Sequence, residues 1–361
     1  KILPALNLAN CWKQIYVTII SLSAGCLISF NILSIFRDYA PKFVCFKNWL
    51  YSSRKFISSL SGASNFCNRE LDIRFASYLA GLIEGDGTII VPKTERSAKN
   101  KLYYPSIQIV FDLRDFPLAL MVQSKLSHGS ISKIKGSNAY LLSINKMEGI
   151  ILVTNVINGY MRTPKIIALY RLIDWLNTRF DLKIEKKNKD IKDITSNSWL
   201  AGFIDACKAG HFSVRTTLGN KCSFSLRSTK IECKFELSRQ SRQIDHNNQD
   251  NFEYLNLIAN FLSSTVKEIK MDKPKPQYRV RTTSLGGNLI LVSYLEKYPL
   301  FSSKYLNYKD WLKVLEYFQR SPKKHTEPES IKAIIEIKLQ MNNKRTEFNW
   351  DHLNSFYNLY K

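Results

Sequence analysis

The chain has 361 residues, and 45% of them are hydrophobic, a globular composition long enough for about two or three domains. Its 53 Lys and Arg residues outnumber its 30 Asp and Glu residues, which gives a formal net charge of +23. This excess favours a polyanionic partner, nucleic acid before an anionic membrane. Seven cysteines without a CxxC pair and five scattered histidines argue against a disulfide scaffold and a Cys/His zinc site.

An N-terminal extension, residues 1–70, contains an uncharged run at residues 14–36. The run has the length of one membrane span of about 20 residues, but its many Ser, Thr and Asn side chains equally fit a buried helix or a peripheral extension. Residues 37–55 mix basic and aromatic side chains, as in an arm that lies on nucleic acid or on a membrane surface. Membrane contact through residues 14–36 therefore stays an open alternative.

The most informative pattern is an internal repeat. Residues 78–87 read YLAGLIEGDG, and residues 199–206 read WLAGFIDA. Further along each copy, the run Asp-Trp-Leu occurs at residues 174–176 and again at 310–312. The repeat predicts two related units, residues 71–181 and 199–361, joined by a polar linker at residues 182–198.

Each unit is predicted to begin with its motif helix, N-capped by Asp72 in the first unit and by one of residues 196–198 in the second. Apolar and polar residues then alternate as in half-buried antiparallel strands, at residues 104–111, 211–215, 230–237 and 277–281. The polar faces of such strands can enter a DNA major groove and contact base edges. On this basis nucleic-acid contacts are predicted for Gln108, Lys133, Arg215, Lys230, Lys234, Gln277, Arg279 and Arg281.

With its two motifs the sequence resembles the LAGLIDADG homing endonuclease family, in the branch encoded by mitochondrial group I introns. The resemblance covers residues 71–361. It implies an α+β fold of two tandem repeats related by a pseudo-two-fold axis, a monomer that imitates a dimer. Two antiparallel sheets would form a saddle over DNA or RNA, with the two motif helices at its centre. The small residues Ala80, Gly81, Ala201 and Gly202 would let these helices pack closely.

The resemblance also implies Mg²⁺-dependent hydrolysis of a DNA phosphodiester. Asp86 ends the first motif helix, where the helix dipole is negative, and a Mg²⁺ ion shared with a phosphate oxygen would offset that charge. Family members carry a lysine near the active site, and Lys146, just after the strand at residues 141–144, fits that role. Asp86 and Lys146 are therefore the predicted catalytic residues.

The second motif departs from the family pattern. No acid stands at Cys207, and Asp205 corresponds to Glu84 rather than to the metal-binding position. Lys208 would place an ammonium group where a metal ion would sit. The second unit also has no lysine in the stretch that corresponds to Lys146, at residues 283–286. Weak, nicking or absent DNA cleavage is expected from such a half-intact site.

Three functions remain in competition. The first is a site-specific DNA endonuclease that recognises a long site and, with one half-site disabled, nicks one strand or cuts both slowly, with Mg²⁺ needed only if the site is active. The second is a binding protein, which is favoured over efficient double-strand cutting. It would be a maturase that stabilises its folded group I intron RNA or, more broadly, a catalytically inactive structural protein of an RNA–protein assembly such as the mitochondrial ribosome. The third is a membrane-anchored protein held by residues 14–36. The expected location is the mitochondrion, in the matrix or, with that anchor, at the inner membrane.

Overall fold

The computed structural model describes residues 70–94, 96, 98–206, 210–217, 230–243, 249–282, 284–320 and 327–361. The predicted uncharged run and basic aromatic arm lie outside the described residues, and so do Cys207 and Lys208. All described residues belong to one compact unit. Within the described part of the chain, no helix is both long and apolar enough to cross a membrane.

The first repeat contains a four-stranded antiparallel sheet with the strand order β1-β2-β4-β3. Its helices and strands, in chain order, are α3 (Ile73–Asp86), β1 (Gly87–Ile90), β2 (Ser106–Asp112), α4 (Phe116–Leu126), β3 (Ser130–Lys133), β4 (Ala139–Ile144), α5 (Met147–Ile157) and α6 (Ile166–Phe180). Asp72 caps α3 as predicted, because its side chain accepts a hydrogen bond of 2.8 Å from the backbone N–H of Arg74.

The second repeat has the same strand order in its own four-stranded antiparallel sheet, β5-β6-β10-β9. Its helices and strands are α7 (Trp199–Asp205), β5 (Gly210–Thr217), β6 (Lys230–Gln240), β7 (Arg242–Gln243), β8 (Gln249–Asp250), α8 (Phe252–Phe261), β9 (Val266–Ile269), β10 (Gln277–Arg281), α9 (Leu285–Lys297), α10 (Lys304–Gln319) and α11 (Pro328–Leu339). The predicted fold class, an α+β protein of two tandem repeats, is confirmed.

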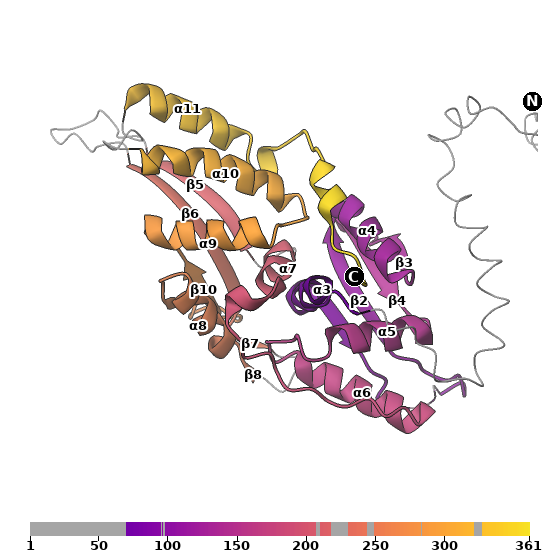
Figure 1. Ribbon diagram of the computed structural model, residues 1–361. Helices are drawn as coiled ribbons and strands as arrows, with labels where there is room; N and C mark the ends of the chain where they lie inside the picture. Colours follow the sequence, from indigo (N-terminus) through magenta and orange to yellow (C-terminus); the bar gives the residue numbers. More distant parts are fainter. Residues whose placement is uncertain are drawn as a thin grey trace, which may run out of the picture. The chain divides into compact units, whose positions relative to one another are not determined.

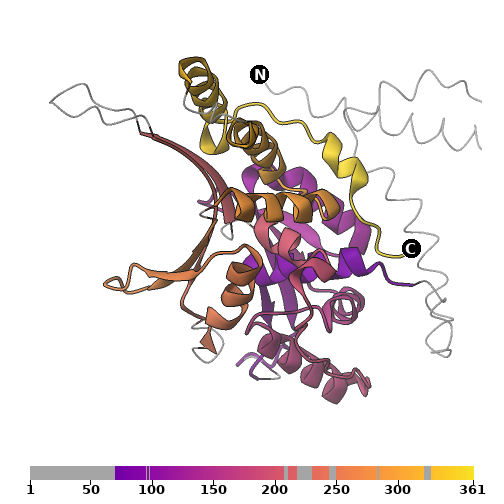
Figure 2. The same ribbon diagram turned by 60° about the vertical axis from the view of Figure 1, so that its left-hand side comes forward.

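Alternation along the strands separates a helix-facing side of each sheet from an outward side. In β6 the side chains of Ile231, Cys233, Phe235 and Leu237 are buried, and the residues between them are only partly buried. Figure 2 shows helices of the second repeat against one face of this long, curved sheet. The apolar side therefore forms the core, and the polar side is left for contacts outside the fold.

The two motif helices lie next to each other between the sheets (Figure 1). Helix α3 is buried at every residue from Phe75 to Gly85, and α7 at every residue from Trp199 to Asp205. A helix that is buried all round has no solvated face, so its neighbours on every side must be packed protein. The ends of α3 and α7 are thereby fixed at the centre of the molecule.

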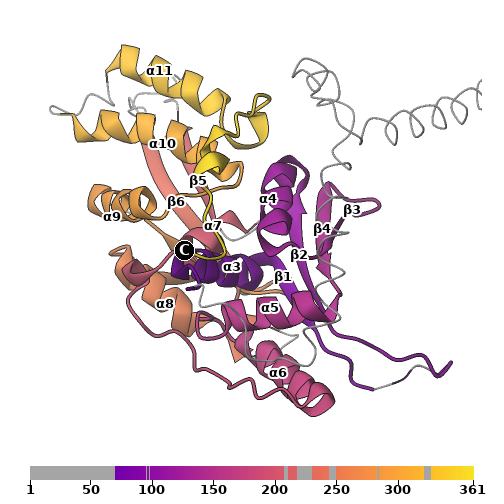
Figure 3. The same ribbon diagram turned by 45° about the vertical axis from the view of Figure 1, so that its right-hand side comes forward.

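The C-terminal segment of the second repeat returns to the first repeat (Figure 3). The backbone N–H of Asp72 donates to Leu359 O, and the N–H of Lys361 donates to Glu70 O, at 3.1 and 3.0 Å. The ring of Phe356 packs edge-on against Tyr78 of α3, with ring centroids 5.6 Å apart. This strap ties the two repeats together at the start of the first motif helix.

Candidate active site

Close approach of α3 and α7 depends on small residues. A Cβ atom added to Gly81 would lie 2.0 Å from the carbonyl oxygen of Trp199, and one added to Gly202 would lie 2.0 Å from that of Tyr78. Ala80 and Ala201 are fully buried in the same region. A larger side chain at either glycine would push the backbones apart, so the helix pair requires the glycines that the motif supplies.

Three side-chain contacts join the two helices with the symmetry of the repeat. The hydroxyl oxygens of Ser77 and Ser198, which are 121 residues apart in the chain, lie within 2.8 Å of each other. The Tyr78 hydroxyl donates to the Asp205 carboxylate at 2.8 Å. In the reciprocal contact, the Trp199 indole N–H donates to the Glu84 carboxylate at 2.6 Å. Asp205 therefore holds in α7 the position that Glu84 holds in α3.

Both of these carboxylates serve to hold the fold together. Glu84 also accepts hydrogen bonds from the backbone and hydroxyl of Thr163, each 2.7 Å long. Asp205 also accepts from the backbone N–H of Phe301 at 2.6 Å and from the Ser302 hydroxyl. Burial raises the pKa of both carboxyl groups, and the donated hydrogen bonds oppose that rise. Their oxygen atoms are occupied by protein donors, as expected of structural rather than metal-binding groups.

Two lysines that sequence reasoning missed close the C-terminal ends of the motif helices. The Lys165 ammonium donates to the carbonyls of Ile83 and Glu84, both at 3.0 Å, and of Gly87 at 2.7 Å. The Lys304 ammonium donates to the carbonyls of Ile204 and Ala206. A cation at this end of a helix is favoured by the helix dipole. The available signal was a second repeat, Thr-Pro-Lys at residues 163–165 and Ser-Ser-Lys at residues 302–304.

Lys146, the predicted catalytic lysine, lies elsewhere. It is exposed and occupies the N-cap position of α5. Leu142 of β4 pairs with Ile109 of β2, and Ile109 pairs with Gly87 at the start of β1. Strands β4 and β1 therefore run in the same direction. From Leu142 the chain moves away from Asp86 for four more residues before it reaches Lys146. The geometry gives no support to the prediction for Lys146, and the lysine that touches the end of α3 is Lys165.

Asp86 ends α3, as predicted, and it has an ion-pair partner from the other repeat. Nη1 of Arg239, on β6, lies 3.8 Å from Oδ1 of Asp86, and the two side chains are only 18% and 13% exposed. Nη2 of Arg239 donates to Gly85 O at 2.6 Å, and the guanidinium group lies over the Phe203 ring, 4.8 Å from its centroid. A nearly buried arginine thus lies beside the carboxylate of the first motif.

Arg239 breaks the pattern of its strand. The buried, helix-facing residues of β6 continue through Leu237 to position 239, where a cation replaces the apolar side chain. Its Nε is buried and has no hydrogen-bond partner among the described residues. A cavity of about 320 Å³ beside it is also lined by Gly85, Lys165 and Tyr254. A space for a polar group therefore adjoins the end of α3.

The described residues contain no group of three or more His, Cys, Asp or Glu side chains that could hold a metal ion. Asp86 offers one carboxylate, which fits a Mg²⁺ ion that takes its other oxygen ligands from water and a substrate phosphate. Such an ion would have to displace the Arg239 guanidinium group from part of its contact with Asp86. The donor set fits half of a metal site.

The outward face of the second sheet collects several of the predicted nucleic-acid residues. Arg215 is exposed on β5, and Arg279 on β10 is half-buried. The register places Arg215 opposite Glu232 and Arg281 opposite Glu236. Arg281 forms an ion pair with Glu236 at 2.7 Å, and Lys234 forms one with Glu232 at 2.8 Å. The face is therefore a mixed array of charges. Of the residues that the sequence predicts to contact nucleic acid, this face holds Arg215, Lys234, Gln277, Arg279 and Arg281. The side chain of Lys230 lies outside the described residues.

In the first sheet the two residues predicted to contact nucleic acid, Gln108 and Lys133, lie on opposite sides. Gln108 is half-buried and pairs with Thr88, which is exposed on the outward face. Lys133 pairs with Tyr140, and the Tyr140 ring packs on Phe116 of α4 with centroids 4.6 Å apart. Paired residues point to the same side of a sheet, so Lys133 lies on the helix side, at an exposed strand end. Gln108 and Lys133 do not form one surface.

The LAGLIDADG endonuclease family model matches residues 79–176 and 200–315. Over 311 residues the chain is 33% identical to the intron-encoded DNA endonuclease aI3 of Saccharomyces cerevisiae, an alignment that covers 79% of this chain and 73% of that protein. This chain belongs to the LAGLIDADG endonuclease family. The uncharacterized cox1 intron-2 37.2 kDa protein of Schizosaccharomyces pombe is 30% identical over 259 residues, 69% of this chain and 68% of that one.

The chain is also similar to an RNA maturase and to a solved homing endonuclease structure. The intron-encoded RNA maturase bI4 of Saccharomyces cerevisiae is 33% identical over 138 residues, which are 38% of this chain and 19% of the maturase. The solved structure of the LAGLIDADG homing endonuclease I-GzeII with its DNA target superposes with a TM-score of 0.57, at 19% identity, over 75% of this chain and 99% of that one. The chain thus has the fold of the homing endonucleases and belongs with intron-encoded endonucleases and maturases.

Proposed function

We propose that this protein is an intron-encoded nucleic-acid-binding protein with one usable catalytic half-site, which nicks DNA slowly or not at all and binds its group I intron RNA. The observation that carries the proposal is that Asp86, the carboxylate of the first motif, lies 3.8 Å from a cation of the chain, Arg239. Asp205 supports it, because three protein groups hold that carboxylate in the fold.

In the half-site, Asp86 would hold a Mg²⁺ ion together with a phosphate oxygen of the substrate. When bound, that ion would activate water and stabilise the leaving oxygen in phosphodiester hydrolysis. Lys165 fixes the end of α3 and brings a positive charge beside it, which favours a phosphate group there. With one carboxylate in place, hydrolysis of one strand is the expected limit of the chemistry.

Binding is less sensitive than cleavage to the loss of a catalytic group. A net charge of +23 suits either DNA or RNA, because phosphate contacts supply most of the affinity and carry no sequence information. The likeness to an RNA maturase favours intron RNA as the main ligand. Relatives named as intron-encoded, one of them from cox1, favour a mitochondrial location.

The experiment uses a supercoiled plasmid that carries the joined exons flanking the coding intron. Wild-type protein with Mg²⁺ should convert it to nicked circles without linear product, and Asp86→Asn should abolish nicking while leaving binding of the plasmid and of the intron transcript unchanged. Linear product formed as fast as nicks would contradict the half-site, and nicking by Asp86→Asn would contradict the role of Asp86.

A catalytically inactive role in an RNA–protein assembly is the second candidate, and the pairing of Asp86 with Arg239 also favours it. Protein isolated from its native source would then carry structural RNA instead of the intron. Absence of nicking in the wild type, together with ribosomal RNA in the bound fraction, is the combination that would select this alternative over a maturase.

A further inference from the structure

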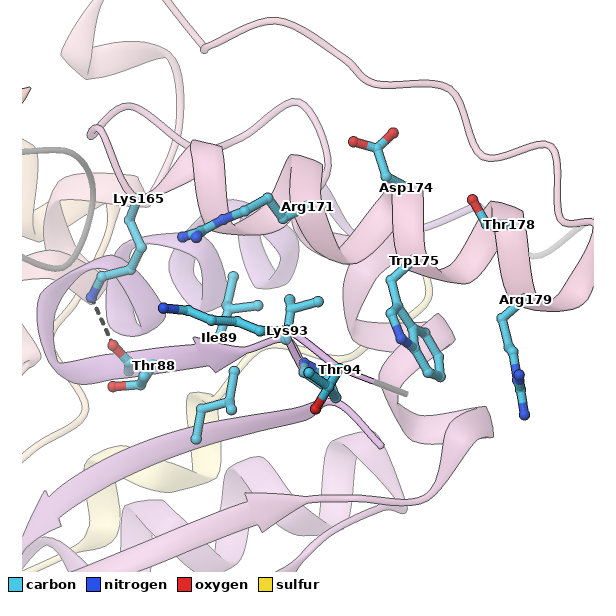
Figure 4. Close-up of a pocket in the computed structure, with 14 residues that line it drawn as sticks. Thr88, Ile89, Lys93, Thr94, Lys165, Arg171, Asp174, Trp175, Thr178 and Arg179 are labelled. Atoms are coloured by element: carbon cyan, nitrogen blue, oxygen red, sulfur yellow. Dashed lines mark hydrogen bonds between the residues drawn. The ribbon is translucent and has the colours of Figure 1, made fainter. Parts of the chain in front are cut away.

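A cavity of about 860 Å³ lies between β1 with the segment that follows it and helix α6. Figure 4 shows its lining, with Lys93 on the β1 side and Arg171, Trp175 and Arg179 along α6. These side chains are not core residues: Lys93, Arg171 and Arg179 are exposed, and Trp175 is half-buried. The cavity is therefore an open, cationic space with an aromatic wall.

The α6 wall follows helical spacing. Arg171, Trp175 and Arg179 are four residues apart, so they lie along one side of the helix with the indole between two guanidinium groups. The Trp175 ring is held edge-on by Phe180, with centroids 5.9 Å apart. The acidic group of this wall, Asp174, forms an ion pair with Lys186 at 2.7 Å, which offsets its charge. The wall thus presents a supported aromatic ring flanked by positive charges.

The cavity lies at the β1 edge of the first sheet, and its lining reaches both sides of that strand. In β1 the residues alternate, with Ile89 buried and Thr88 and Ile90 exposed, and all three contribute to the lining. The basic and aromatic wall formed by Arg171, Trp175 and Arg179 comes from α6, which is not part of the sheet. A strand that contacts this wall would therefore lie at the edge of the sheet, beside any duplex on its outward face.

We propose that this cavity is a binding site for single-stranded RNA, with an unpaired base stacked on Trp175 and the flanking phosphates on Arg171, Arg179 and Lys93. Aromatic rings between basic side chains are the means by which proteins hold single strands, since each base has a stacking face and each linkage a charge. A duplex is not accommodated, because its base faces are already stacked on one another. The choice of RNA over DNA rests on the proposed maturase function.

The test measures fluorescence anisotropy of an oligouridylate of about 12 nucleotides, which has little structure, against a duplex DNA of equal length. Trp175→Leu should weaken oligouridylate binding by about tenfold, whereas Trp175→Phe, which keeps a stacking ring, should weaken it far less. Arg171→Gln with Arg179→Gln should lower the salt dependence of log K by about 1.4, two phosphates at about 0.7 each. Duplex binding should stay the same in all three variants.

The matched control is Lys309→Gln with Lys332→Gln, which removes two exposed charges from α10 and α11, outside the cavity lining. It should leave oligouridylate binding within about twofold of wild type. An equal loss in the control, an unchanged affinity in Trp175→Leu, or a parallel fall in duplex binding would each overturn the site. Tighter binding of oligodeoxyuridylate than of oligouridylate would overturn its assignment to RNA. Plasmid nicking should not respond to Trp175→Leu, so failure here is distinguishable from failure of the half-site.

Discussion

Arg239 on β6 of the second repeat reaches the end of the first motif helix, where its Nη1 lies 3.8 Å from Oδ1 of Asp86. The contact pairs the first motif carboxylate with a cation that is part of the chain. At this separation two unit charges interact by about 1 kcal/mol in water and by more where water is excluded. Any cation that binds Asp86 has to compete with this interaction.

Replacing Arg239 with Gln should therefore strengthen binding of a metal ion at Asp86. We expect the dissociation constant of Tb³⁺, followed by its sensitised luminescence, to fall about fivefold, which corresponds to about 1 kcal/mol. Arg239→Lys keeps the charge and should show a smaller gain. The gain should vanish in the double variant Asp86→Asn with Arg239→Gln. A gain that survives in this double variant would place the ion at some other carboxylate.

Lys165 and Lys146 provide a matched pair of substitutions. Lys165→Met removes three hydrogen bonds to carbonyls at the end of α3, and we expect the free energy of unfolding to fall by about 2–3 kcal/mol. Lys146 is exposed at a helix start, so Lys146→Met should change the unfolding free energy by less than about 0.5 kcal/mol. Urea unfolding measures both. Nicking should be lost in Lys165→Met and kept in Lys146→Met, and the reverse result would restore the sequence-based prediction.

The sequence predicts the repeat, the position of Asp86 at a helix end and the strands at residues 104–111, 211–215, 230–237 and 277–281. Each of these features shows as a pattern within a short stretch of sequence. The sequence did not predict the charged contacts around that helix end. Lys165 binds a carbonyl 82 residues earlier in the chain, Lys304 one 100 residues earlier and Arg239 one 154 residues earlier. Local alternation marks Arg239 only as a cation on an apolar face. Its partner is defined by how the two repeats pack, which no local pattern encodes.

The reciprocal contacts between the motif helices predict a loss of stability when either donor is removed. Tyr78→Phe removes one donor from the buried Asp205 carboxylate, and Trp199→Phe removes one from the buried Glu84 carboxylate. Each substitution should lower the free energy of unfolding by about 1–3 kcal/mol, because a buried carboxylate loses a hydrogen bond that water does not replace. Trp199→Phe should lower it further, because the smaller ring leaves a void at a buried site. Tyr104→Phe, at a tyrosine that is 53% exposed, is the control and should be nearly neutral. A Tyr78→Phe variant as stable as this control would contradict the role of the Asp205 contact.

Asp115, from the first repeat, accepts a hydrogen bond of 2.7 Å from the backbone N–H of Ser303 in the second repeat. Burial raises the pKa of this carboxyl from 3.8 to about 6. The folded protein then binds a proton more tightly than the unfolded chain, so this group stabilises the fold below pH 3.8 and the contribution is lost as the pH rises through about 6. The full change is about 3 kcal/mol.

Asp115→Asn keeps the acceptor oxygen and removes the charge. The variant should therefore show a smaller fall in unfolding free energy than wild type between about pH 4 and 6 in urea titrations at each pH, and the fall that remains comes from other carboxyl groups with a raised pKa, such as Glu84 and Asp205. A variant with the same slope as wild type across that interval would show that Asp115 is not the titrating group.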